Sequence, residues 1–221
     1  MDLEAFIITN GRSTFKYTKI ALMQQSMKFK ITVIKNMNWV DALNKCLKIC
    51  TSTHYLRCDD DFILHPLAIE FMWERCRQNK NAAFCVAKLW EDWTKKPVNG
   101  IKIYNKDIVL KLGGFSANHL GKVDKIFKKR LDRSKYSSSG CGKSVVGLHT
   151  CGEWEEQLRY EALWSSMSDT PYKKTTHKDM SVYKKSVKQQ FKMRKTFIEN
   201  KNKNKSKNTD FYKFIKNRSK K

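Results

Sequence analysis

Apolar and polar residues alternate along the first part of the chain with two different periods. Residues 3–9 (LEAFIIT), 29–34 (FKITVI) and 54–58 (HYLRC) have the short, β-rich pattern of strands. Residues 13–25 and 39–50, which lie between these strands, have the spacing of helices. Right-handed connections turn the order strand, helix, strand, helix, strand into a parallel sheet. The pattern therefore predicts an α/β fold.

The clearest helix is predicted for residues 39–50, directly after Asn38, a residue type that favours helix N-caps. Its apolar stripe has intervals of three and four residues and is formed by Trp39, Ala42, Leu43, Cys46, Leu47 and Cys50. Another helix is expected around Pro66, because proline suits a first helical turn.

The second half of the chain alternates less regularly. We expect strands at residues 82–89, 100–104 and 145–149, and helices at residues 106–112, 116–136 and 152–167. A flexible loop is expected at residues 137–142 (SSSGCG), because serine and glycine predominate there.

A chain of 221 residues can form one sizeable α/β domain but is short for two independent cores. We predict one catalytic domain over residues 1–171, with a nucleotide-binding β/α half at 1–81 and an acceptor half at 82–171. Residues 172–221 are expected to form a basic tail, partly helical and partly disordered. Within it, residues 200–208 (NKNKNKSKN) are too polar to pack and are predicted to be disordered.

The formal net charge of +24 is concentrated in this tail, where 18 Lys and Arg residues face 3 Asp and Glu residues. Basic residues are attracted to anionic lipid headgroups, and aromatic residues such as Phe211 and Phe214 lie among them. We therefore expect peripheral contact with an anionic membrane. Nucleic acid is the rival partner, although the first 171 residues contain no specific nucleic-acid-binding motif. An accumulation of Lys and Asn codons is a third explanation, and it requires no partner.

Two further features concern the cellular compartment. No apolar stretch is long enough to cross a bilayer, and the N-terminus, with Asp2 and Glu4, lacks the basic start of a signal peptide. The seven cysteines are odd in number and form no C-x-x-C pair, which favours buried, reduced thiols. These features predict a cytoplasmic protein, peripheral at the inner membrane face.

Three consecutive carboxylates, Asp59, Asp60 and Asp61, follow the third predicted strand. In an extended chain, residues two apart point the same way, so Asp59 and Asp61 would present two carboxylates to one side. Ligands of open α/β sheets bind at this carboxyl edge. Hard cations such as Mg²⁺ or Mn²⁺ take oxygen ligands and share their shell with substrate phosphates. The acidic triplet thus indicates a metal site for a diphosphate, and a solvated loop or helix cap is the alternative.

The sequence around the triplet resembles family 2 glycosyltransferases, which have a GT-A fold and a D-x-D motif. The resemblance runs from residue 5 to about residue 72 and rests on Ala42-Leu43-Asn44-Lys45, on Tyr55-Leu56-Arg57-Cys58-Asp59-Asp60-Asp61 and on Pro66. It implies the nucleotide-diphospho-sugar transferase (GT-A) fold, with a mixed, mostly parallel sheet flanked by helices. It also implies a hexosyltransferase-like enzyme with a nucleotide-sugar donor.

By this resemblance, Asp59 would contact the donor's ribose or the metal, and Asp61 would ligate Mn²⁺ or Mg²⁺ directly. Thr9 and Asn10 would border the base and ribose. The family usually has an aspartate after the second strand, where this chain has Asn36, which could hydrogen-bond a base. The predicted donor-binding residues are Thr9, Asn10, Arg12, Asn36, Asn44, Asp59 and Asp60.

Two acidic clusters are candidates for the catalytic residues. Glu155 and Glu156 lie at the start of the helix predicted for residues 152–167, which resembles the family's acidic motif over the sugar. Asp92 and its neighbour Glu91 lie between two tryptophans, whose apolar faces suit sugar rings. Acidic residues in a first helical turn also interact favourably with the helix dipole, which is the alternative for the first cluster. His149, after an apolar strand, is a candidate third metal ligand beside Asp59 and Asp61.

These features favour a metal-dependent glycosyltransferase that moves a sugar from a nucleotide-sugar donor to a glycan, lipid-linked or protein acceptor. A nucleotidyltransferase of sugar phosphates also uses metal-bound carboxylates, but it usually has a Gly-rich loop after the first strand, where this chain has only Gly11. A basic nucleic-acid-binding protein is the third hypothesis, and it would rest on the tail alone.

Overall fold

The computed structural model describes residues 2–91, 96–116, 123–150, 196, 198–200, 202 and 210–218. The strands are β1 Leu3–Thr9, β2 Lys30–Lys35, β3 His54–Asp59, β4 Phe62–Leu64, β5 Ala82–Glu91, β6 Lys96–Asn105 and β7 Ser137–His149. The helices are α1 Phe15–Met23, α2 Trp39–Ile49, α3 Ala68–Arg77, α4 Lys106–Lys111, α5 Val123–Asp132 and α8 Asp210–Arg218.

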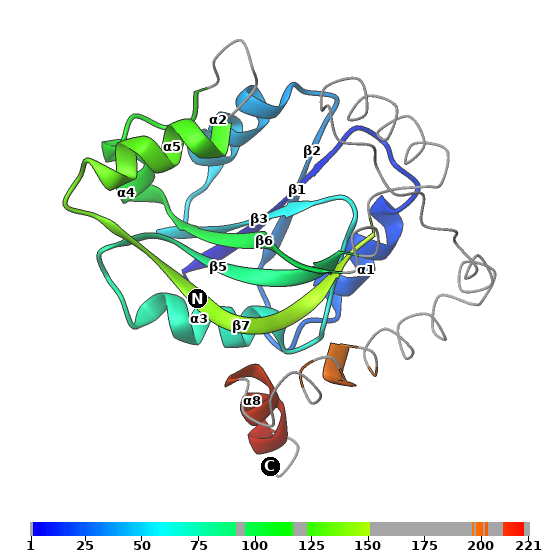
Figure 1. Cartoon of the computed structure of the whole chain (residues 1–221). Helices are drawn as coiled ribbons and strands as arrows, with labels where there is room; N and C mark the ends of the chain where they lie inside the picture. The colour runs from blue at the N-terminus through cyan, green and yellow to red at the C-terminus, as the bar shows by residue number, and fades with distance from the viewer. Residues whose placement is uncertain are drawn as a thin grey trace, which may run out of the picture.

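One seven-stranded sheet connects the described strands in the order β2-β1-β3-β6-β5-β7-β4. Helices cover both faces, with α2, α4 and α5 on one face and α1, α3 and α8 on the other (Figure 1). Of the six pairings among these strands, three are parallel and three are antiparallel. The predicted α/β class with a mixed sheet between helices is confirmed.

The first β/α units form as their hydrophobic pattern predicts. β1 pairs in parallel with both β2 and β3, which places the first three strands side by side. The side chain of Asn38 accepts a hydrogen bond from the backbone N–H of Asp41 at 3.0 Å, so the predicted N-cap of α2 is confirmed. Leu43 and Cys46, from the apolar stripe of this helix, are completely buried against the sheet.

The second half departs from the predictions at two strands. β7 covers 13 residues and includes residues 137–142, so the predicted flexible loop is wrong. The neighbouring β5 pairs with this segment, and the register places Val86 opposite Gly140. β4 was not predicted, because its three residues are too few to show a period. The predicted helix at residues 116–136 is confirmed only for α5, and the helix predicted at 152–167 lies outside the described residues.

Six of the seven cysteines lie in the described part of the chain, and all six are buried and free, as predicted. They are Cys46, Cys50, Cys58, Cys76, Cys85 and Cys141, whereas Cys151 lies outside the described residues. Among the described helices, none combines the length and apolar character that crossing a membrane requires.

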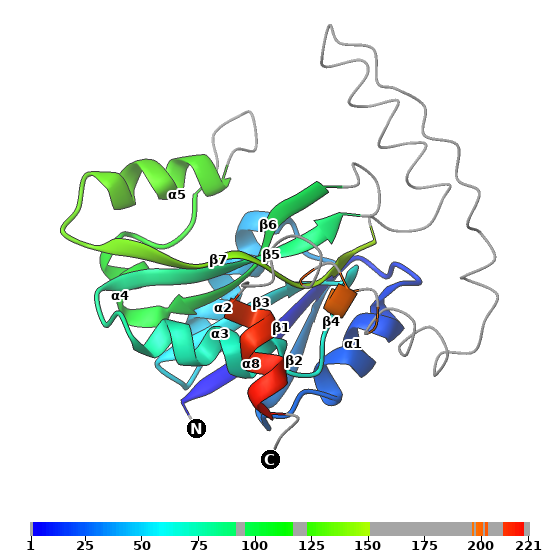
Figure 2. The same cartoon turned by 60° about the horizontal axis from the view of Figure 1, so that its bottom comes forward.

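Part of the predicted basic tail packs against the sheet. We call residues 198–200, 202 and 210–218 the C-terminal strap. Phe211 of α8 is fully buried, and its ring centroid lies 4.9 Å from that of Phe71 in α3. The backbone N–H of Phe211 donates a hydrogen bond to Ser144 Oγ in β7. Figure 2 shows α8 lying across α3 and β7. Phe211 and Ile215 therefore belong to the core, and their side chains are not available to a membrane.

The strap also completes the edge of β7. The Asn202 carboxamide accepts a hydrogen bond from the Val145 N–H at 3.1 Å and donates one to the Val145 carbonyl oxygen at 2.6 Å. β4 ends at Leu64, opposite Gly147, so Asn202 fills the ladder positions beyond the end of β4. Asn202 is buried, and the prediction of disorder for residues 200–208 is wrong at this position. The division of the chain at residue 171 stays a prediction.

The strap generates a stability prediction. Phe211→Ala removes a fully buried ring from the contact with α3 and β7, and we expect a loss of about 3 to 5 kcal/mol of unfolding free energy. Urea unfolding of the full-length chain measures the loss. Lys213→Ala, on the exposed side of the same helix, is the control and should change the free energy by less than about 0.5 kcal/mol. Equal effects of the two substitutions would contradict the packing of α8.

A second prediction concerns Glu4 in β1, whose carboxylate is buried near the start of the strand. Its Oε1 accepts hydrogen bonds from the N–H groups of Thr51 and Ser52 at 2.7 and 2.9 Å, and from Thr51 Oγ1 at 2.6 Å. Burial opposes the charge of Glu4, but these hydrogen bonds outweigh it and lower the pKa from 4.5 to about 2. The charged carboxylate therefore stabilises the fold above pH 4.5, and this stabilisation disappears as the pH falls to about 2.

Glu4→Gln should lower the unfolding free energy at pH 7 by up to about 3 kcal/mol. The difference between the wild type and this variant should narrow as the pH falls from 5 towards 2, because the wild-type side chain becomes protonated. Chemical unfolding across this range measures both quantities. A difference that stays constant with pH would contradict the assignment.

Candidate functional site

β1, β2 and β3 end at one edge of the sheet, and the acidic triplet lies at this edge. The register pairs Thr9 with Lys35 and Ile8 with Asp59. β3 ends at Asp59, and Asp60 and Asp61 form a turn into β4. The predicted position at the carboxyl edge is confirmed. The predicted extended chain through Asp61 is wrong, because the chain turns there to pair β4 with β7.

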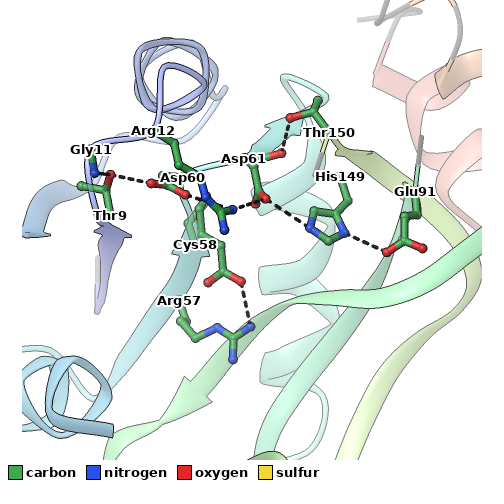
Figure 3. Close-up of polar contacts among 11 residues, drawn as sticks. Thr9, Gly11, Arg12, Arg57, Cys58, Asp60, Asp61, Glu91, His149 and Thr150 are labelled. Atoms are coloured by element: carbon green, nitrogen blue, oxygen red, sulfur yellow. Dashed lines mark hydrogen bonds and ion pairs between the residues drawn. The ribbon is translucent and has the colours of Figure 1, made fainter. Parts of the chain in front are cut away.

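Asp60 is held by residues that follow β1. Thr9 Oγ1 donates a hydrogen bond to Asp60 Oδ2 at 2.5 Å, and Arg12 Nη1 lies 3.7 Å from Asp60 Oδ1. The Gly11 N–H donates to Thr9 Oγ1 at 2.9 Å, which orients the hydroxyl towards Asp60 (Figure 3). Gly11 has a φ of 90°, a left-handed conformation that favours glycine at this turn.

The side chain of Asp61 is almost completely buried, and its carboxylate lies next to the guanidinium of Arg12 and the imidazole ring of His149. Arg12 Nη1 lies 2.7 Å from Asp61 Oδ2, and His149 Nε2 lies 3.3 Å from the same oxygen. The backbone oxygen of Asp61 accepts hydrogen bonds from the N–H and Oγ1 of Thr150 at 3.0 and 3.1 Å. Burial opposes the charge of Asp61, but the hydrogen bond from His149 and the charges of His149 and Arg12 lower its pKa.

Of the three carboxylates, Asp59 is the one whose negative charge is offset least by its described neighbours. Its Oδ2 lies 3.4 Å from Arg57 Nη2, a longer contact than the one that Arg12 makes with Asp61. Burial raises the pKa of Asp59, and the negative charge of Asp61 adds to this effect, although Arg57 opposes it. The ionised form of Asp59 is therefore costly in the absence of another cation.

A line of three side chains, Asp61, His149 and Glu91, extends from the triplet to the ends of β5 and β7 (Figure 3). His149 Nδ1 lies 3.1 Å from Glu91 Oε1, while Nε2 faces Asp61. The β5–β7 register pairs Glu91 with His149, and the β4–β7 register pairs Phe62 with His149. Since both ring nitrogens face carboxylates, His149 in this arrangement orients Asp61. Its role as a third metal ligand stays a prediction.

The carboxylates nevertheless fit a divalent cation. Asp59 Oδ1 and Asp61 Oδ1 are buried and have no hydrogen-bond partner in the described part of the chain. Such orphaned oxygens are costly unless a cation or donor meets them. No group of three or more His, Cys, Asp or Glu side chains among the described residues is arranged to hold a metal. Two carboxylates with substrate phosphates and water are, however, a common shell for Mg²⁺.

The other predicted donor-binding residues lie in two places. Asn10 and Asn36 are exposed at the ends of β1 and β2, and the Asn36 N–H donates to the Thr9 carbonyl oxygen at 3.2 Å. These residues therefore lie at the same edge as the triplet. The Asn44 carboxamide instead binds both the N–H and the carbonyl oxygen of Phe115, at 2.9 Å each, and so fixes the segment after α4. Its assigned role in donor binding stays a prediction.

The candidates for the catalytic base, Glu155, Glu156 and Asp92, lie outside the described residues. Glu91, the neighbour of Asp92 in the sequence, is described, and its contact with His149 was not predicted. Sequence reasoning missed this pair because the two residues are far apart in the chain and meet only through the β5–β7 pairing.

Arg57 was also missed as a functional residue. Its side chain is buried beneath the ring of Trp39, 4.8 Å from the ring centroid, and lies 3.9 Å from Asp124 at the start of α5. Lys102, which is opposite Arg57 in β6, contacts the same Asp124 carboxylate at 2.9 Å. The signal was present in the sequence, because an arginine inside an apolar strand, two residues before Asp59, must face the same side of the sheet as Asp59.

Comparisons with known proteins find similar architectures among solved structures but no similar sequence. No protein-family model matches the sequence, and no curated protein matches it. In structure, the chain is similar to S. aureus TarS 1–349, with a TM-score of 0.53 and 13% identity over 77% of this chain and 67% of that chain. It is also similar to TarS 1–349 in complex with UDP-GlcNAc, with a TM-score of 0.53 and 12% identity over 76% of this chain and 64% of that chain.

A third similar structure is the mannosyltransferase PcManGT from Pyrobaculum calidifontis in complex with GDP-Man and Mn²⁺. Its TM-score is 0.52 and its identity 9%, over 77% of this chain and 66% of that chain. This chain thus spans about two thirds of the length of these structures. At such low identity the similarity shows the fold, and this fold is the predicted one.

The unequal compensation of the carboxylates generates a prediction. At pH 7 without metal, Asp59→Asn should raise the thermal unfolding midpoint, because the raised pKa of Asp59 means that its charge destabilises the fold. Asp61→Asn should lower the midpoint, because the lowered pKa of Asp61 means that its charge stabilises the fold. Calorimetry in EDTA measures both, with Asp132→Asn on exposed α5 as a control of small effect. If both triplet variants lose stability, this electrostatic description is wrong.

Proposed function

We propose that this chain is a metal-dependent glycosyltransferase that takes its sugar from a nucleotide-sugar donor. The observation that carries the proposal is a pair of buried carboxylate oxygens, of Asp59 and Asp61, that have no hydrogen-bond partner among the described residues and lie at the edge where three neighbouring strands end. The fold supports it, since the similar structures include one with UDP-GlcNAc and one with GDP-Man and Mn²⁺.

Asp59 and Asp61 would hold Mn²⁺ or Mg²⁺ and leave the remaining positions to the donor's diphosphate and water. A cation held there neutralises charge on the diphosphate and on the departing nucleoside diphosphate. His149 keeps Asp61 oriented, and Glu91 orients His149 in turn. Asp60 remains bound to Thr9 and supports the turn that presents its two neighbours.

The nucleoside would lie over the ends of β1 and β2, beside Thr9, Asn10 and Asn36. A carboxamide offers both a donor and an acceptor, so Asn36 does not restrict the base to uracil. Glu155, Glu156 and Asp92 stay candidates for the base that deprotonates an acceptor hydroxyl. A glycan, lipid-linked or protein acceptor, contact of the Lys-rich segment with an anionic membrane, and a cytoplasmic location remain predictions.

The proposal predicts that the purified full-length chain hydrolyses or transfers from a nucleotide-sugar only in the presence of Mn²⁺ or Mg²⁺. Asp61→Ala should reduce the rate by on the order of 10²-fold or more, because a metal ligand is lost, and His149→Ala by about 10- to 100-fold. A panel of UDP- and GDP-sugars, with release of the nucleoside diphosphate as the measured product, tests this. Asp132→Asn, an exposed acid on α5, is the control and should leave the rate unchanged.

Turnover that persists in EDTA, or that survives Asp61→Ala, would contradict the metal-dependent transferase. Release of pyrophosphate from a nucleoside triphosphate would instead identify a nucleotidyltransferase.

A further inference from the structure

The acidic triplet already holds a cation that belongs to the chain itself. Arg12 Nη1 contacts Asp61 Oδ2 at 2.7 Å and lies 3.7 Å from Asp60 Oδ1 (Figure 3). The side chains of these two acids are 2% and 6% exposed, so one guanidinium offsets charge that has little access to water. The contact with Asp61 is a charge-assisted hydrogen bond, among the stronger kinds in proteins.

The side chain of Arg12 is more exposed to solvent than the two carboxylates that it contacts. Its side chain is 37% exposed, and it comes from the turn between β1 and α1. At Gly11, in the same turn, no atom of the described residues other than Gly11 and its two chain neighbours lies within 4 Å of the place that a Cβ would occupy. Asp61, in contrast, is fixed through its backbone oxygen by two hydrogen bonds from Thr150. An incoming cation would therefore meet a partly exposed guanidinium and a carboxylate whose backbone is held in place.

The guanidinium and a divalent cation compete for the same carboxylate. Arg12 contacts Oδ2 of Asp61, and a divalent cation at Oδ1 of the same carboxylate would repel the guanidinium at short range. The planar fork of arginine also matches the oxygens of a phosphate. A nucleoside diphosphate beside the metal would thus give the displaced Arg12 a new anionic partner.

We propose that Arg12 is an exchangeable counter-ion, which holds the triplet before a metal binds and passes to the donor's diphosphate when a divalent cation takes its place. The exchange makes the metal and the nucleoside diphosphate bind cooperatively, because the metal releases the group that the diphosphate binds. This inference rests on the proposed function, since it requires the metal site at Asp61.

Binding of Mn²⁺, followed by electron paramagnetic resonance on the full-length chain, tests the exchange without any measurement of turnover. Arg12→Gln removes the competitor, so it should bind Mn²⁺ alone about tenfold more tightly than the wild type. The gain in Mn²⁺ affinity on adding UDP or GDP should be smaller in this variant than in the wild type. Lys19→Gln, an exposed charge on α1 without a described contact to the triplet, is the control for the loss of one positive charge and should resemble the wild type.

Arg12→Lys gives a second, conservative variant. A lysine keeps the charge but lacks the planar fork, so its affinity for Mn²⁺ alone should stay near that of the wild type, while the gain from the nucleotide falls. Circular dichroism confirms that each variant is folded before it is compared.

The outcomes separate this inference from the proposed function. If Arg12→Gln binds Mn²⁺ alone no more tightly than Lys19→Gln does, while Asp61→Asn abolishes binding, the metal site stands and the exchange is overturned. If the wild type binds no Mn²⁺ with either nucleotide, the metal site itself is wrong, and the exchange fails with it.

Discussion

Repulsion among three adjacent carboxylates is the constraint on which the arrangement of this edge depends. Charges buried away from water destabilise a fold unless opposite charges or hydrogen-bond donors meet them. The groups that meet the triplet come from separate parts of the chain and are Thr9, Arg12, Arg57 and His149. The sheet brings these groups together, because β1 and β3 are neighbours and β4, which follows the triplet, pairs with β7.

The antiparallel part of the sheet holds one side of the site through very few residues. β4 has only three residues, yet the pairing of Phe62 with His149 determines how Asp61 and His149 face each other. The C-terminal strap supports this region from outside. Asn202 continues the ladder along β7, and Glu199 lies 3.0 Å from the ring of His65, the residue after β4. A segment that composition describes as a Lys-rich tail thus contributes to the core beside the candidate site.

The parts of the molecule that could be predicted from sequence are those in which local pattern and long-range pairing agree. Neighbours in sequence determine three features that could be predicted: the apolar stripe along α2, the cap at Asn38 and the triplet after β3. The strand at residues 137–142 could not be predicted from sequence, because its Gly and Ser residues form a strand by pairing with β5. Phe211 poses the same difficulty. Phe211 is buried against Phe71, which is far away in the chain. The lysines around Phe211 in the sequence make the whole segment look polar when its composition is averaged.

For the candidate site, the same reasoning explains which residues were found. Thr9, Asp59 and Asp61 could be located because strand ends can be counted, whereas the Asp61, His149 and Glu91 line requires the order of strands in the sheet. Sequence order gives no indication that β6 enters between β3 and β5 or that β7 returns to β4.

The negative charges of the three carboxylates are offset by their neighbours to different degrees, and this difference decides where the edge could accept a cation. Asp60 is bound by a neutral hydroxyl, and Asp61 by the partly exposed guanidinium of Arg12 and by His149. Among the described residues, the charged group next to Asp59 is the buried Arg57, at a longer distance. If all three were fully satisfied, the edge would have no affinity for a cation. If none were satisfied, the repulsion would oppose folding. In the described part of the chain, partial compensation leaves two buried oxygens without hydrogen-bond partners, Asp59 Oδ1 and Asp61 Oδ1, and the proposed cation would stabilise the structure further there.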